Sequence, residues 1–427
     1  MEHVTVCMHA SDSIPSERLA SRLSLWMLRP YLDLTPADVG PLHVQCIEQG
    51  WSALTDAASP RFIPQRAMPP GFRLQLGQEA GAPYALHDPR ELPEHLRTER
   101  WNALCHLLDG WSDLPGERQC RLASLLHSMC LYDLLLRLIP ETEGSVHSND
   151  ADGIHLMFWR ASASFLGKQL KRATRYQQHD MAVFQRIALN ASDVVPDGFN
   201  ATAKVFVHKA KTRAAVSELV EWGNLFEKAL QAASTRMDDF TAELYTSRFY
   251  RGIGFLPQRN GDKAEVIRLM DLAESHARKM KPETSAQTVL YRENLHALLE
   301  SRTKEALWLG DKDLALARAL GVVEVDPFDA KAWVEVGEVR WLREEWREAS
   351  EAYAVAAMLG PPASAVGRYM AGACLRKLDM PLLSALLFKE TLELDPLGVS
   401  PRVQIQDLPD MEVLEVLKCW NDATAEP

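Results

Sequence analysis

The chain has 427 residues, of which 47% are hydrophobic and 25% are charged, so it is long enough for two or three folded units and ordinary enough in composition to fold throughout. Its formal net charge is −11. We therefore expect no nucleic-acid partner and no membrane partner, because both require a concentrated positive surface. The seven cysteines lack Cys-x-x-Cys spacing and lie mostly among apolar residues, which predicts reduced thiols and a cytoplasmic protein without a signal peptide.

Residues 1–140 are predicted to form an N-terminal helical domain with a proline-rich insertion. Apolar residues at helical spacing predict helices over 16–28, 41–54, 96–108 and 117–138. Prolines interrupt residues 60–93, and within this insertion 72–76 alternates between apolar and polar residues and is expected to pair with 84–87 as a small β-hairpin. The polar stretch 141–152 marks the boundary of this domain.

Residues 153–285 are predicted to be a middle helical region, and degenerate hairpin repeats are one interpretation of its weak repeat pattern. Helices are expected over 156–175, 181–189 and 214–233, followed by a hairpin of 240–254 and 263–281 with its turn at Asn260-Gly261-Asp262. A long helix is expected over 286–309. Two basic stretches, 168–175 and 204–213, are expected to lie on solvated helix faces.

A repeat pattern begins at Ala330. Counted from that residue, the pattern places Trp333 at position 4, Gly337 at 8, Ala349 at 20, Tyr353 at 24, Ala356 at 27 and Pro361 at 32. Small residues at positions 8 and 20 allow two antiparallel helices to cross closely, the aromatic residues fill the space around the crossing, and proline ends the second helix. The pattern resembles that of the tetratricopeptide repeat family. Parts of it recur upstream at Gly310, Ala315 and Pro327, and downstream at Gly372, Phe388 and Pro396.

The resemblance implies an all-α fold in which residues 286–400 form three tetratricopeptide-like hairpins of an α-solenoid. Their turns are expected near Gly310, Arg343 to Glu345 and Leu378 to Met380, and a short helix at 410–420 is expected to cap the last repeat. Thr303 and Arg368 depart from the family pattern, which has Gly and Trp at those places.

In this family the first helix of each hairpin lines a concave groove that binds a protein or peptide partner. Carried onto this chain, the groove positions are Glu300, Lys304, Leu307, Trp308, Lys331, Val334, Glu338, Trp341, Leu342, Tyr369, Ala373, Arg376 and Lys377. Members that bind a C-terminal carboxylate need Asn where this chain has Lys304 and Glu335, so that ligand is not expected. The alternative is that flanking segments of the chain itself fill the groove.

Signatures of catalysis and of metal binding are scarce. The sequence has no phosphate-binding Gly-x-x-x-x-Gly-Lys motif, no Gly-x-Ser-x-Gly and no His-Glu-x-x-His. Glu293 and His296 have the spacing of a di-iron helix motif, but no partner motif accompanies them. We therefore expect these two to be surface residues, and we expect no metal and no cofactor.

An aromatic and arginine cluster has the chemistry to hold an acidic group, because arginine forks onto carboxylates and phosphates. Its members are Tyr245, Arg248, Tyr250, Arg251 and Arg259. The simpler interpretation is an ordinary helix whose long side chains extend to solvent.

Three hypotheses for function follow from these patterns. The first is a cytoplasmic helical-repeat scaffold that binds a protein or peptide. The second is an enzyme, or an obligate accessory subunit of one, with its site between residues 60 and 290. The third is a homodimer whose repeats form the dimer contact.

Overall fold

The computed structural model describes residues 42–55, 88–92, 94–129, 131–140, 151–168, 174–191, 196–327, 329–358, 363–394 and 399–406. All regular secondary structure in these ranges is helical, so the predicted all-α class is confirmed for them. None of the helices described is long and apolar enough to cross a membrane. The described residues form two compact units, an N-terminal unit up to Leu309 and a C-terminal unit from Gly310.

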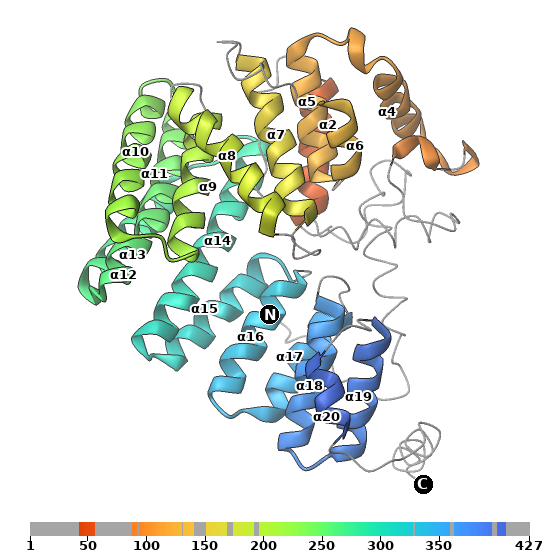
Figure 1. Ribbon diagram of the computed structural model, residues 1–427, viewed down its shortest axis with the longest axis vertical. Helices are drawn as coiled ribbons and strands as arrows, with labels where there is room; N and C mark the ends of the chain where they lie inside the picture. The colour runs from red at the N-terminus through yellow and green to blue at the C-terminus, as the bar shows by residue number, and fades with distance from the viewer. Residues whose placement is uncertain are drawn as a thin grey trace. The chain divides into compact units, whose positions relative to one another are not determined.

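The N-terminal unit is a succession of helices that pack against their neighbours in chain order, as in an α-solenoid (Figure 1). Its helices are α2 (Leu42–Thr55), α4 (Glu99–Asp109), α5 (Gly116–Ser128), α6 (Tyr132–Leu138), α7 (Ala151–Lys168), α8 (Thr174–Asn190), α9 (Asp197–Lys211), α10 (Val216–Ser234), α11 (Asp239–Ile253), α12 (Phe255–Asn260), α13 (Lys263–Lys279) and α14 (Ser285–Leu309), with short 3-10 turns at Pro89–Glu91, Glu94–Leu96 and Trp111–Asp113.

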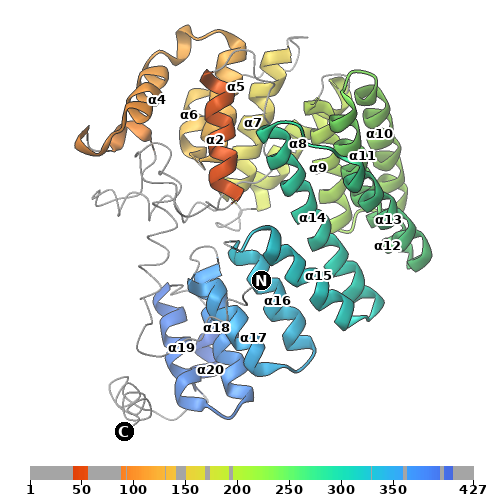
Figure 2. The ribbon, with the colours of Figure 1, turned by 180° about the vertical axis from the view of Figure 1, so that it is seen from behind.

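The first and last described helices of this unit also contact each other. The red helix α2 lies beside α5 in Figure 2, and Arg121 of α5 donates from Nη1 to the Ala53 carbonyl at 2.6 Å. Ala53 also packs against Val289 of α14, and both are buried. As a result α14 is covered by α2 as well as by α11 and α13.

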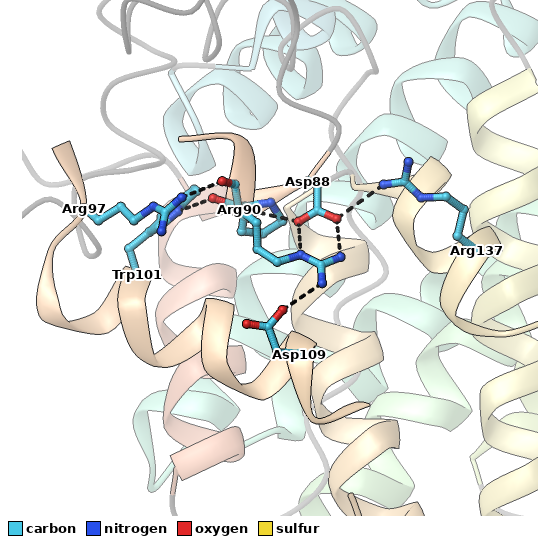
Figure 3. Close-up of polar contacts among 7 residues, drawn as sticks. Asp88, Arg90, Arg97, Trp101, Asp109 and Arg137 are labelled. Carbon is cyan, nitrogen blue, oxygen red and sulfur yellow. Dashed lines mark hydrogen bonds and ion pairs between the residues drawn. The ribbon is translucent and has the colours of Figure 1, made fainter. Parts of the chain in front are cut away.

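Polar contacts attach residues 88–97 to the neighbouring helices (Figure 3). Arg90 forks onto Asp88 through Nε at 2.8 Å and Nη2 at 2.6 Å, and its Nη1 donates to Asp109 of α4 at 2.9 Å. Arg137 of α6 approaches Asp88 at 3.4 Å. The Trp101 indole donates to the Pro89 carbonyl at 2.6 Å. These contacts replace the regular backbone pairing that a proline-containing segment lacks.

Some sequence predictions about the helices of this unit were wrong. The single helix expected over 117–138 breaks between Ser128 and Tyr132. The Leu131 N–H donates to the Leu126 carbonyl, five residues back, at 3.0 Å. This capping bond replaces the four-residue hydrogen bonding of α5 and ends that helix.

The full extent of helix α9 was not predicted, although the basic stretch 204–213 within it was expected to lie on a helix face exposed to solvent. Lysines interrupt its apolar positions, which dilutes the helical pattern. Lys204 Nζ lies 5.8 Å from the ring centroid of Phe158 and 5.4 Å from that of Phe184, and burial lowers the pKa of Lys204 to about 8. This lysine therefore occupies an aromatic setting rather than a solvated face.

The C-terminal unit consists of α15 (Lys312–Val325), α16 (Ala330–Leu342), α17 (Trp346–Met358), α18 (Ala363–Lys377), α19 (Pro381–Leu394) and α20 (Val399–Gln406). Helices α16 and α17 form one tetratricopeptide-like hairpin, and α18 and α19 form the next (Figure 1). The predicted turns are confirmed, with Glu344 and Asp379 at φ of 64° and 59°.

The predicted close crossing of α16 and α17 is also confirmed. A Cβ placed on Gly337 would lie 2.7 Å from the Tyr353 ring, and one on Gly372 would lie 2.9 Å from the Phe388 ring. Ala349 and Tyr353 are both 0% exposed. Small residues are therefore required where the helices of each hairpin meet.

The remaining predictions about the fold are untested. The first predicted hairpin spans the boundary between the two units, with its turn at Gly310, which has a φ of 90°. The helix at 16–28, the β-hairpin within 72–87 and the capping helix at 410–420 lie outside the described residues. The predicted domain boundaries at 140, 153, 285 and 400 stay predictions.

Candidate functional site

Predicted groove residues of α16 and α18 border one surface of the C-terminal unit, which we call the hairpin face. Lys331, Glu338, Arg376 and Lys377 are exposed, whereas Trp341 and Tyr369 are half-buried. Two apolar side chains on the same helices are also exposed, Leu342 at 45% and Val366 at 43%. Val366 precedes Ala373 by seven residues, or two helical turns, so the two share a side of α18.

An aromatic pair lies at one end of the hairpin face, where α16 ends and α17 begins. The rings of Trp341 and Trp346 meet edge to face, with centroids 4.7 Å apart and planes at 73°. Lys377 Nζ lies 5.7 Å above the Trp346 ring, a cation–π contact that keeps this ammonium next to the pair. Sequence reasoning missed Trp346, because it begins the second helix of the hairpin and is not a groove position of the family.

Trp341 is not a freely exposed anchor. It packs against the small core of this unit, which contains Ala349, Tyr353, Ala371 and Cys374. Burial raises the pKa of the Cys374 thiol to about 12, so the thiol stays protonated and acts as a small apolar group. Trp341 therefore contributes to the fold as well as to the surface.

The edges of the hairpin face carry more positive than negative charge. Lys331, Arg376 and Lys377 are exposed cations, and Glu338 is the exposed anion among the predicted positions. Arg376 also donates a hydrogen bond to Gln404 of α20. A tryptophan pair with cations on the same helices suits a partner that carries both apolar and acidic groups.

The other predicted groove residues belong to α14 of the N-terminal unit. Lys304 Nζ lies 3.9 Å from Glu300 Oε1, and Lys263 Nζ lies 5.8 Å from the centroid of the Trp308 ring. Each of the three thus has contacts within its own unit. Whether they extend the hairpin face stays a prediction.

The expectation that Glu293 and His296 are surface residues was wrong. Their exposures are only 6% and 7%, because α14 is covered by α2, α11 and α13 together. Over the described ranges, no group of three or more His, Cys, Asp or Glu side chains is arranged to hold a metal ion.

Two buried histidine pairs are the nearest arrangements to catalytic groups. His155 Nδ1 lies 3.0 Å from both Asp197 oxygens, and its Nε2 accepts a 2.8 Å hydrogen bond from the Trp159 indole. Both ring nitrogens are therefore occupied, and the imidazole has no lone pair left to act as a base. His127 Nε2 lies 3.0 Å from Ser162 Oγ, but each residue is only 2% exposed, which keeps substrate away from the hydroxyl.

The aromatic and arginine cluster divides into two groups. Arg259 is exposed and donates to the Ala214 carbonyl at 3.4 Å, and Tyr250 stacks on His276 at 5.5 Å. By contrast, Tyr245 and Arg248 are 4% and 5% exposed, and Arg251 is half-buried. The interpretation that these long side chains extend to solvent was therefore wrong for Arg248, because this side of α11 faces neighbouring helices.

Comparison with known proteins gives likenesses of low similarity. No protein-family profile and no curated protein matches the sequence. Among solved structures, YrrB, described as a TPR protein with an unusual peptide-binding site, is 17% identical with a TM-score of 0.32, over 53% of this chain and 98% of that one. The human IFIT1 dimer with m7Gppp-AAAA is 11% identical with a TM-score of 0.35, over 92% of this chain and 84% of that one. Cut9-Hcn1 of the APC/C is 11% identical with a TM-score of 0.24, over 72% of this chain and 74% of that one.

The comparison overturns the expectation that a nucleic-acid partner is excluded. The IFIT1 structures are described with the RNA ligands m7Gppp-AAAA and PPP-AAAA. The expectation was wrong because net charge is a sum over the whole chain and does not report where the charges lie. Arg248 and Arg251 lie close together in a chain whose formal net charge is −11.

Proposed function

We propose that this chain is a scaffold that binds a peptide segment of a protein partner on the hairpin face. The observation that carries the proposal is the half-buried pair of Trp341 and Trp346 with Lys377 beside it. Tryptophan and arginine are over-represented among the residues that dominate binding energy at interfaces. A tryptophan pair already held by the hairpin core loses little side-chain entropy when a partner covers it.

The chemistry of the hairpin face favours a peptide with an apolar anchor next to an acidic residue. Leu342 follows Trp341 on α16 and Val366 lies on α18, and both are more than 40% exposed, so they offer further apolar area on these two helices. The three exposed cations outnumber Glu338, so a carboxylate gains more attraction than repulsion at the edge. We also propose a reducing, cytoplasmic location, which suits the buried free thiols of Cys105, Cys120 and Cys374.

Peptide selection against the purified full chain tests the proposal. We expect the selected peptides to combine an aromatic or aliphatic residue with a neighbouring Asp or Glu. In fluorescence polarisation with the best labelled peptide, Lys377→Glu should weaken binding by about tenfold, equivalent to ~1.4 kcal/mol. Arg347→Glu is the matched control, because Arg347 is an exposed cation on α17, outside the predicted groove helices. The proposal fails if no peptide binds better than its scrambled version, or if both charge reversals weaken binding equally.

A further inference from the structure

The interior side of α11 carries two arginines that lack a counter-ion. Arg248 and Arg251 are three residues apart and so share a side of the helix. Arg248 is 5% exposed, and its Nε has no hydrogen-bond partner. Arg251 is half-buried, and its Nη1 has none either. Among the described residues, no carboxylate forms an ion pair with either guanidinium.

The nearest acidic groups are engaged elsewhere. Burial and then the charge of Arg248 lower the pKa of Arg251 to about 10, and the charge of Glu300 opposes them. Glu300 itself lies 3.9 Å from Lys304 Nζ. Asp197 influences the neighbouring Tyr245, but its oxygens lie 3.0 Å from His155 Nδ1. Glu300 therefore offsets only part of the unfavourable effect that burial and the charge of Arg248 have on the Arg251 cation.

Such a pair is costly for a purely structural purpose. A buried charge without a partner destabilises the folded state, and a second like charge next to it adds to the cost. Arg248 does lie over the Tyr245 ring, with its guanidinium carbon 5.4 Å from the centroid. That contact compensates one side of one guanidinium and leaves its Nε and the Arg251 Nη1 unpaired.

We propose that Arg248 and Arg251 form an anion site that holds a phosphate or carboxylate group of a small ligand, separate from the peptide site on the hairpin face. The planar fork of arginine donates two parallel hydrogen bonds to either oxyanion. The part-exposed Arg251 provides access from solvent.

Calorimetric titration of the full chain with pyrophosphate and, separately, with succinate tests the site, with ionic strength held constant by sodium chloride. We expect saturable binding of at least one probe, and the probe that binds identifies the anion as phosphate or carboxylate. Arg251→Met should weaken that binding at least tenfold. Arg251→Lys should weaken it less, because lysine keeps the charge and loses the fork. Arg259→Met, which removes an exposed cation, should leave it unchanged.

Thermal unfolding separates loss of the site from loss of the fold. Without ligand, Arg251→Met should unfold at the same or a higher temperature than the wild-type chain, because it removes an unpaired, partly buried charge. A purely structural Arg251 would give the opposite result, a lower unfolding temperature, and would overturn the proposal. It is also overturned if neither probe binds saturably, or if Arg251→Met and Arg259→Met bind alike.

Discussion

The crossing of α16 and α17 provides the sharpest test of the repeat assignment, through Gly337→Ala. The added Cβ would lie 2.7 Å from Tyr353 Cε1 and 2.8 Å from Cδ1 and Cζ, well inside the ~3.5–4.0 Å of favourable carbon contact. Tyr353 is 0% exposed, so its ring cannot swing into solvent to make room. The two helices must move apart, or the ring must leave its preferred rotamer.

The expected cost follows from two opposing terms. Overpacking a tight core contact costs ~1–3 kcal/mol, and the distances at Gly337 favour the upper end because ring carbons rather than a flexible chain end are in the way. Replacing glycine by alanine inside a helix returns up to ~1 kcal/mol through helix propensity. The net destabilisation of the hairpin should be about 2 kcal/mol. Hydrogen exchange followed by mass spectrometry should then show amides of α16 and α17 exchanging about thirtyfold faster.

A second substitution tests whether the ring is the cause. Tyr353→Leu removes the atoms that the new methyl group would meet, so adding Gly337→Ala to that background should cost much less than about 2 kcal/mol, a strong departure from additivity. Gly110→Ala is the control, because the nearest atom to a Cβ there lies 3.7 Å away. Unchanged exchange in Gly337→Ala, or additive effects in the double variant, would refute the reasoning about the crossing.

The remaining predictions concern three other side chains. Tyr353 Oη is buried without a hydrogen-bond partner, so Tyr353→Phe should leave stability unchanged or raise it by ~1 kcal/mol; a loss above that size in a urea melt would reveal an unrecognised partner. For Asp88, burial acts to raise the pKa, but hydrogen bonds and charge from Arg90 outweigh it and lower the pKa overall. Its contribution to stability is therefore complete above about pH 4 and is lost as pH falls through the lower folded pKa. Asp88→Asn should reduce the stability that the chain loses in acid by at most about 1 kcal/mol, because Arg90 is 40% exposed. An unchanged dependence of stability on acid pH would count against a lowered pKa for Asp88. Trp341→Ala should weaken the selected peptide about thirtyfold and also lower the unfolding temperature, since Trp341 packs on the hairpin core; a lower unfolding temperature with unchanged peptide affinity would confine Trp341 to the fold.

Predictions from the sequence were confirmed at positions where the local geometry restricts the type of residue. Gly337 and Ala349 had to be small for the helices to cross, and the positive φ of Glu344 and Asp379 lies in the turns that the repeat spacing required. The long helix before Gly310 was predicted from its apolar spacing and ends at Leu309. Such features depend on local geometry, which spacing along the chain reports directly.

Predictions failed where the answer depends on how many sides of a helix are covered. Helix α14 contacts three other helices, so Glu293 and His296 became buried although their types suggested a surface. Arg248 of α11 is likewise buried, and Lys204 of α9 lies close to two aromatic rings. A periodic pattern identifies the most apolar side of a helix, but it does not say whether the polar sides meet water or another helix.

The difference matters because polar groups inside a helical array carry more functional information than those on its surface. An exposed lysine needs no protein partner, since water solvates it at little cost. A guanidinium that is 5% exposed, as in Arg248, has lost most of that solvation and must be compensated by a carboxylate, a ring or a ligand. The Tyr245 ring supplies part of this compensation, and no described carboxylate pairs with either arginine. An incoming anion would supply the counter-charge that is still missing. The burial of Arg248, which contradicted the surface interpretation, therefore also points to the candidate anion site in an otherwise acidic chain.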